Sequence, residues 1–204
     1  MSDTVDYKPA GWHSRGYLPH FDVGEVFQSI TFRLFDSMPQ SLLTKWREEL
    51  THESRDFEDE LRWRIEGYLD RGYGVCHLAD TRIASIVQHA LLHFDSERYR
   101  LSAWVVMPNH VHLLAAPCYG HSLSKIVHSL KSYTAQEANN TLQAKGRFWF
   151  EDYFDRYIRN AKHFENAVSY IENNPVRAGL CAFPGEWPFG SAWFRARSAN
   201  ASRG

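Results

Sequence analysis

Two histidines stand two residues apart inside a hydrophobic run. His110 and His112 lie in the segment WVVMPNHVHLLAAP, residues 104–117. In a β-strand, residues i and i+2 point to the same face, so the two imidazoles would project side by side. Neutral imidazole is a common ligand of divalent metals. The spacing therefore indicates half of a metal site, although a chain with 11 histidines can also contain such a pair by chance.

A helix predicted after the histidines offers further reactive groups. Over residues 122–142 the apolar stripe of the helix continues into Tyr133 and Glu137. These two residues are four apart and would be stacked on one helix face. A carboxylate on a packed face is costly unless it is paired or binds a metal. We therefore expect this helix to cross the sheet face that carries the histidines, unless its end leaves the sheet for water.

Together these groups would perform phosphoryl transfer. The metal, held by the two histidines and Glu137, would polarise a phosphate and neutralise charge in the transition state. The phenolic oxygen of Tyr133 would be the nucleophile. Because a phenolate leaves more easily than an alkoxide, a phosphotyrosine bond is a reversible intermediate. This chemistry suits strand transfer better than hydrolysis.

The elements that must position these groups can be read from periodicity and capping residues. They are a strand at 24–36, two helices within 39–70, a helix at 81–95 capped by Asp80 or Thr81, a hairpin at 98–117 that turns at Pro108-Asn109, a helix at 121–143 capped by Ser122, a strand at 147–160 and a helix at 161–175 ended by Asn-Asn-Pro. This order predicts an α+β fold, a ferredoxin-like split βαββαβ antiparallel sheet with helices on one face and extra helices.

Length and composition fit one globular domain. The 204 residues are 44% hydrophobic, and we expect a single domain with its core at about 15–175 and a partly flexible tail at 176–204. The net charge of −1 gives no global sign of a nucleic-acid partner. No apolar run approaches the roughly 18 residues of a membrane span, and no signal peptide is visible. Three scattered cysteines predict reduced thiols in a cytoplasmic protein.

Several segments resemble a known family. They are GYLPHFD, ITFRLFDSMP, AWVVMPNHVHLL, HSLSKIVHSLKSYTAQEAN, FWFEDYFDRYIRN and YIENNPVRAGL. Over about residues 15–195 the chain resembles the REP-associated tyrosine transposases, a bacterial branch of the single-tyrosine HUH endonucleases and transposases. The resemblance implies the HUH fold and cleavage of single-stranded DNA at REP hairpins with Mg²⁺ or Mn²⁺. A 5′-phosphotyrosine and a free 3′-OH would form. It also implies a monomer or homodimer acting at the bacterial nucleoid, with no membrane partner.

Residue by residue, the resemblance makes His110 and His112 the metal histidines and Tyr133 the nucleophile. In related transposases the third ligand is a polar residue one turn after the tyrosine, often glutamine. Glu137 holds that place here, and Gln136 and Asn140 are the alternatives. DNA contacts are expected from a mixture of basic and aromatic residues, although the aromatic ones could equally form the core of the last strand. These candidates are Lys131, Lys145, Arg147, Trp149, Arg156, Arg159 and Arg177.

Other functions fit the same residues less well. Two histidines and a carboxylate also ligate iron in non-haem oxygenases, but Tyr133 would then have no role and a β-barrel would be expected. A TIM-barrel hydrolase would need roughly 250 residues. The more serious alternative is a non-cleaving module that binds structured DNA or RNA on the same sheet. The complete set of histidines, tyrosine and glutamate favours the enzyme.

Overall fold

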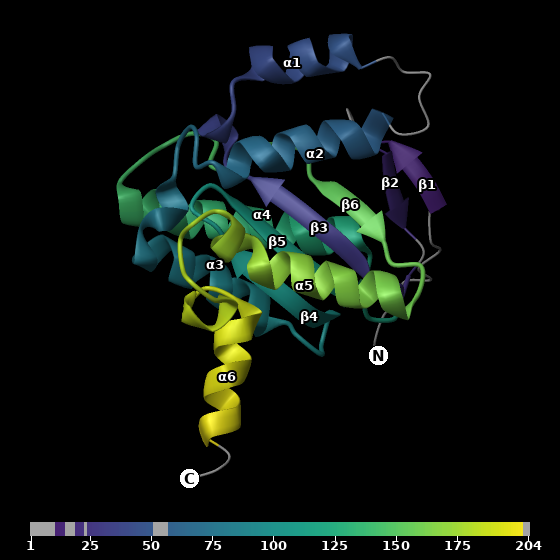
Figure 1. Ribbon diagram of the computed structural model, residues 1–204, viewed down its shortest axis with the longest axis vertical. Coiled ribbons are helices and arrows are strands. Elements are labelled where there is room, and N and C mark those ends of the chain that lie inside the picture. Colours follow the sequence, from purple (N-terminus) through teal and green to yellow (C-terminus); the bar gives the residue numbers. More distant parts are fainter. Residues whose placement is uncertain (1–10, 15–18, 23, 51–56, 202–204) are drawn as a thin grey trace, which may run out of the picture.

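The computed structural model describes residues 11–14, 19–22, 24–50 and 57–201 (Figure 1). Its strands are β1 (Gly11–Ser14), β2 (Pro19–Asp22), β3 (Gln28–Arg33), β4 (Tyr99–Val106), β5 (His110–Pro117) and β6 (Phe154–Tyr157). Its α-helices are α1 (Gln40–Glu49), α2 (Phe57–Asp70), α3 (Thr81–His93), α4 (Leu123–Leu142), α5 (Ala161–Arg177) and α6 (Ser191–Ala201). Short 3-10 turns lie at Phe35–Ser37, His77–Ala79 and Pro184–Glu186.

The central sheet has four antiparallel strands in the order β4-β5-β3-β6. The α+β class, the antiparallel sheet and the β4–β5 hairpin agree with the sequence. The last strand is shorter than expected, because Phe148 and Trp149 are buried in the core before β6 begins. Strands β1 and β2 pair in a separate small sheet that the sequence pattern did not reveal.

Helices cover both faces of the sheet, whereas the sequence predicted helices on one face. On one face Val111 and Leu113 of β5 share a hydrophobic core with residues of α3 and α4. On the other face Val105 and Leu114 pack with Ile171 of α5, and α2 lies beside α5. In Figure 1, α5 crosses in front of the sheet and α4 lies behind it. The expectation of one covered face is therefore wrong.

Capping residues in the sequence predicted most helix ends correctly. The side chains of Asp80 and Ser122 accept hydrogen bonds from the backbone N–H groups of Arg82 and Lys125, as N-caps do. Helix α5 is the exception, since it runs through Pro175 to Arg177. A proline in the last turn of a helix removes one backbone hydrogen bond near the end, where the remaining turns still hold. Its continuation matters because this turn carries polar residues toward the sheet.

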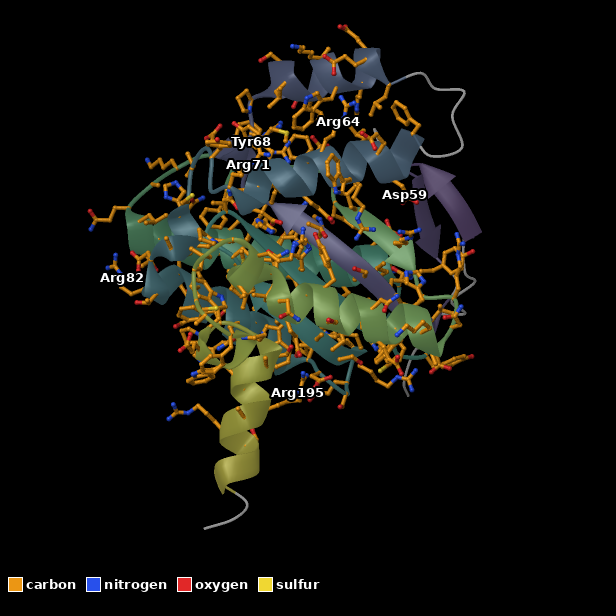
Figure 2. All side chains as sticks on the ribbon, viewed as in Figure 1. Asp59, Arg64, Tyr68, Arg71, Arg82 and Arg195 are labelled. Carbon is orange, nitrogen blue, oxygen red and sulfur yellow. The ribbon has the colours of Figure 1, made fainter. Side chains whose placement is uncertain are left out.

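The C-terminal segment is helical over residues for which we expected a flexible tail. Helix α6 begins at Ser191, whose hydroxyl accepts a hydrogen bond from the backbone N–H of Trp104 at 3.3 Å. The guanidinium of Arg195, which is labelled in Figure 2, pairs with Glu172 of α5. The segment therefore docks on β4 and α5 together. In the described part of the chain, no helix is both long and apolar enough to span a bilayer.

Candidate metal centre

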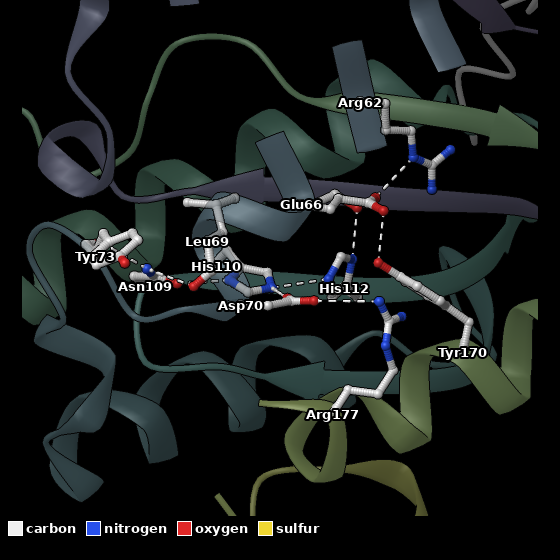
Figure 3. A network of polar contacts seen from close by, with 11 residues as sticks. Arg62, Glu66, Leu69, Asp70, Tyr73, Asn109, His110, His112, Tyr170 and Arg177 are labelled. Atoms are coloured by element: carbon white, nitrogen blue, oxygen red, sulfur yellow. Dashed lines mark hydrogen bonds and ion pairs between the residues drawn. The ribbon is translucent and has the colours of Figure 1, made fainter. Parts of the chain in front are cut away.

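His110 and His112 lie side by side on β5 with their rings completely buried. They alternate with Val111, which faces α3 and α4, so both imidazoles point to the opposite face. Their Nε2 atoms are 2.9 Å apart (Figure 3). The expected convergence of the two histidines is therefore present.

The hydrogen bonds behind the rings fix which ring nitrogen is free. The amide nitrogen of Asn109 donates to the carbonyl oxygens of Leu69 and Tyr73, both at 3.1 Å. Its Oδ1 is therefore an acceptor, 2.7 Å from Nδ1 of His110, and Nδ1 must carry the proton. Nε2 of His110 then presents a lone pair to the centre, as in metal-ligating histidines. Nδ1 of His112 has an equivalent partner in the hydroxyl of Thr31, at 2.7 Å.

Asp70 supplies a carboxylate from the last residue of α2. Its Oδ1 lies 3.6 Å from Nε2 of His110 and has no hydrogen-bond partner among the described residues. Its Oδ2 lies 3.8 Å from the guanidinium of Arg177. Among the described residues, Asp70, His110 and His112 form the cluster whose ligand atoms lie close enough to hold one metal ion.

Burial shifts the pKa of all three groups in the direction that favours the neutral form. Desolvation raises the pKa of Asp70 to about 6, although the nearby charge of Arg177 lowers it. Desolvation also lowers the pKa of His112 to about 3 and that of His110 well below its usual range. Both rings are therefore neutral, which is the form that binds metals. A divalent cation would compensate the charge of a carboxylate held out of water.

Asn174 adds a fourth polar group. It is completely buried on α5 and lies beside Asp70, whose carboxyl pKa it lowers. Neither its Oδ1 nor its Nδ2 has a well-formed hydrogen bond to a described residue. A buried amide without partners is costly, so Oδ1 of Asn174 is available as a further ligand. The orphaned oxygens of Asp70 and Asn174 and the convergent histidines together fit a divalent metal with mixed N and O ligands.

Tyr170 brings a phenol to the centre from one turn earlier on α5. Its ring meets the ring of His112 edge-on, with centroids 5.6 Å apart. Its hydroxyl donates to Oε2 of Glu66 at 2.7 Å, and the guanidinium of Arg177 lies 4.8 Å from the ring centroid. Burial raises the pKa of Tyr170 above its usual range. The hydroxyl is therefore protonated at neutral pH.

The structure does not bring Tyr133 and Glu137 to the histidines. Helix α4 packs its apolar stripe against Val111 and Leu113, which lie on the opposite face of β5 from His110 and His112. Tyr133 is 56% exposed, and Glu137 is absent from the metal-capable cluster of the described residues. The alternatives Gln136 and Asn140 lie on the same helix and are exposed. The expectation that α4 crosses the histidine face is wrong.

Of the seven expected DNA-contacting residues, Arg177 alone contacts described residues of the metal centre. Lys131 donates two hydrogen bonds of 2.7 Å to the carbonyl oxygens of Phe150 and Glu151, and thus holds a loop. Trp149 is buried, and its indole N–H donates to Thr134, so it cannot stack on a base. Arg156 pairs with Asp59 of α2, which is labelled in Figure 2. The remaining three, Lys145, Arg147 and Arg159, are exposed.

The sequence contained a signal for the missed tyrosine. Tyr170 and Asn174 are four residues apart on a helix, the same spacing as Tyr133 and Glu137. A polar ligand one turn after the tyrosine is also what the family resemblance implies. Asp70 had no comparable signal, because it lies 40 residues before the histidines at the end of a charged helix.

A family model described as "Transposase IS200 like" matches residues 76–174. This stretch of the chain is similar to the IS200-like transposase family. This IS200-like segment contains His110, His112, Tyr170 and Asn174, whereas Asp70 precedes it.

Three individual proteins are similar to this chain. The chain is 28% identical over 106 residues to a REP-associated tyrosine transposase of Escherichia coli (strain K12), which covers 51% of this chain and 61% of that protein. The chain thus matches about three fifths of that relative's length. The fold is similar to the solved structure of a REP-associated tyrosine transposase bound to a REP hairpin, with a TM-score of 0.52, 20% identity and coverage of 88% of this chain and 81% of the other. A putative transposase from Deinococcus radiodurans aligns with a TM-score of 0.36 and 18% identity over 79% of this chain and 96% of its own.

Proposed function

We propose that the protein is a metal-dependent endonuclease and strand transferase for single-stranded DNA, with a ferredoxin-like HUH fold. The observation that carries the proposal is the contact of a buried tyrosine ring with one of two convergent imidazoles on one sheet face. Tyr170 contacts His112, and the Nε2 atoms of His112 and His110 face each other. A nucleophile beside a metal site is what phosphodiester transfer requires.

The ligand set we assign is Nε2 of His110, Nε2 of His112, the carboxylate of Asp70 and Oδ1 of Asn174. The two oxygen ligands suit Mg²⁺ or Mn²⁺. When bound, the cation would supply Lewis-acid polarisation of the scissile phosphate. This assignment replaces Glu137 with Asp70 and Asn174.

Tyr170 takes the role of nucleophile that we expected for Tyr133. Its Oη gives up its proton and attacks phosphorus, the bond from phosphorus to the 3′-oxygen breaks, and the DNA 5′-phosphate remains on the tyrosine. The departing 3′-oxygen takes up one proton in exchange, so the strand leaves with a free 3′-OH and no net proton is released. Because a phenolate is a good leaving group, that 3′-OH or another can reverse the step and join strands. Arg177, next to Asp70 and Tyr170, is placed to contact a phosphate oxygen of the bound strand.

The substrate we propose is a REP-type hairpin with a single-stranded flank. Support comes from the name of the Escherichia coli relative and from the hairpin bound in the solved structure of similar fold. The charge of the chain points the same way. A net charge of −1 does not provide the basic field that gives tight, non-specific binding of duplex DNA.

The test is a covalent adduct on a hairpin oligonucleotide that carries a short randomised single-stranded flank. The label is placed at the 3′ end, because the fragment joined to tyrosine is the 3′ one. With Mn²⁺, the wild-type protein should give a labelled band that survives denaturation. Tyr170→Phe should lose the band and still bind the hairpin, whereas Tyr133→Phe, the matched control, should keep it. An adduct that persists in Tyr170→Phe would contradict the proposal, and hairpin binding without any adduct would favour the non-cleaving module.

A further inference from the structure

A second carboxylate lies beside the nucleophile and has no place in the proposed ligand set. Glu66 of α2 is only 8% exposed. Its Oε2 accepts the hydroxyl hydrogen bond of Tyr170 at 2.7 Å, and its Oε1 accepts from Nε of Arg62 at 2.8 Å (Figure 3). Glu66 does not belong to the metal-capable cluster of the described residues. Its contacts are instead with the tyrosine and the arginine.

Helices α2 and α5 meet in matched register at this point. Glu66 and Asp70 are one turn apart on α2, and Tyr170 and Asn174 are one turn apart on α5. Tyr170 donates a hydrogen bond to Glu66, and Asn174 lies beside Asp70. Residues four apart share a helix face, so a single face of each helix supplies both a group for the metal and a group for the nucleophile.

The ion pair with Arg62 fixes the orientation of the Glu66 carboxylate. A buried carboxylate must be paired and hydrogen-bonded to remain in place. The arginine lies one turn earlier on the same helix and occupies Oε1. Oε2 is therefore left for the phenol. The Tyr170 ring is held at its edge by His112 and over its face by Arg177, but neither contact sets the direction of the hydroxyl.

We propose that Glu66, anchored by Arg62, is the positioning residue of the nucleophile. Its carboxylate holds the Tyr170 hydroxyl at the angle from which the oxygen reaches phosphorus. The inference rests on the proposed function of Tyr170. Helix α2 lies entirely outside the IS200-like segment, and the inference gives it the role of orienting a side chain of that segment.

The test measures single-turnover cleavage of the same labelled hairpin pool with Mn²⁺. Glu66→Ala should lower the rate by about a hundredfold, the typical cost of a misplaced reacting group. Affinity for Mn²⁺, measured by calorimetry without DNA, should fall much less than in Asp70→Ala, because Glu66 acts on the metal site only through its charge. Affinity for the hairpin should stay at its wild-type value. Glu66→Gln should restore most of the rate, because its amide oxygen can still accept from the tyrosine hydroxyl.

One further variant tests the proposal if Glu66→Ala does not fold, and another serves as the control. If the melting temperature of Glu66→Ala falls, the double variant Arg62→Met with Glu66→Met replaces it, since it leaves no buried charge unpaired. It should show the same slow cleavage. Glu60→Ala is the matched control, because Glu60 forms the equivalent i,i+4 pair with Arg64 on an open part of α2. Its rate should not change.

Three results would overturn the inference. A wild-type rate in Glu66→Ala would remove any role for the hydrogen bond. A rate in Glu66→Gln as low as in Glu66→Ala would show that the charge of the carboxylate, and not its acceptor oxygen, is required. A loss of Mn²⁺ affinity in Glu66→Ala as large as in Asp70→Ala would make Glu66 a ligand. None of these would disturb the assignment of Tyr170, which fails only if Tyr170→Phe still forms the adduct.

Discussion

The Nε2 atoms of His110 and His112 face each other across 2.9 Å, while both Nδ1 atoms are hydrogen-bonded behind the rings. Asn109 fixes the proton of His110 on Nδ1, so its Nε2 is a lone pair, whereas the hydroxyl of Thr31 can donate to or accept from Nδ1 of His112. In the metal-free protein, Nε2–H of His112 can therefore donate to Nε2 of His110. With the other tautomer of His112, both Nε2 lone pairs face one point and can hold a metal ion.

The first prediction follows from this pair. Mn²⁺ should raise the melting temperature of the wild-type protein, with a gain of about 2.7 kcal/mol in unfolding free energy at a metal concentration of a hundred times Kd. His110→Ala and His112→Ala should each lose that gain. Scanning fluorimetry with and without Mn²⁺ measures it, and His128→Ala on the exposed part of α4 is the control. A full metal-dependent shift in either variant would exclude the histidine centre.

The second prediction concerns the stability that the metal-free protein loses by burying the ionised carboxylate of Asp70. Burial raises its folded-state pKa from 3.8 to about 6. Between these values the folded state binds more protons than the unfolded state, so stability falls as the pH rises through this window and the full penalty remains above about pH 6.

Asp70→Asn should therefore raise the metal-free unfolding free energy at pH 8 by about 1–3 kcal/mol, and the gain should vanish near pH 4. The same variant should lose the stabilisation by Mn²⁺. Urea unfolding at the two pH values, with and without the metal, measures both effects. Equal destabilisation by Asp70→Asn at pH 4 and pH 8 would contradict the argument.

Local sequence signals accounted for the parts of the fold that depend on neighbours in the chain. The β4–β5 hairpin and the caps Asp80 and Ser122 follow from alternation and from side-chain oxygens at helix starts. The histidine pair follows from the period of a strand. Each of these features is decided within a few residues, so periodicity was sufficient.

The choice between Tyr133 and Tyr170 depends on which sheet face each helix covers. Both tyrosines have a polar residue four positions later, so the local pattern cannot separate them. Helix α4 connects two strands and packs with α3, whereas α5 follows the last strand and crosses to the other face. Asp70 reaches the centre through packing of α2 against α5. Such differences in tertiary packing cannot be read from the helical periodicity of the sequence.

The third prediction separates a structural lysine from a DNA-binding one. The ammonium of Lys131 bonds the carbonyl oxygens of Phe150 and Glu151, and burial lowers its pKa to about 8. Lys131→Met should therefore cost about 1–3 kcal/mol of stability, because two carbonyl oxygens lose their donor. Hairpin affinity, measured by fluorescence anisotropy on the folded variant, should not change. A marked loss of hairpin affinity without a loss of folding stability would show that Lys131 contacts the DNA.

The fourth prediction concerns Arg177, the basic residue whose guanidinium lies beside both Asp70 and Tyr170. If it contacts a phosphate, Arg177→Ala should weaken hairpin binding and reduce the slope of log K against log salt concentration by about 1. Because Arg177 also lowers the pKa of Asp70, its removal could act through the metal instead. Mn²⁺ affinity without DNA separates the two routes and should not fall, because the variant removes a positive charge from beside the metal site. Arg177→Lys keeps the charge and should retain the salt slope, while it loses the planar contact with the ring. An unchanged slope in Arg177→Ala would show that the arginine serves the metal centre and not the DNA.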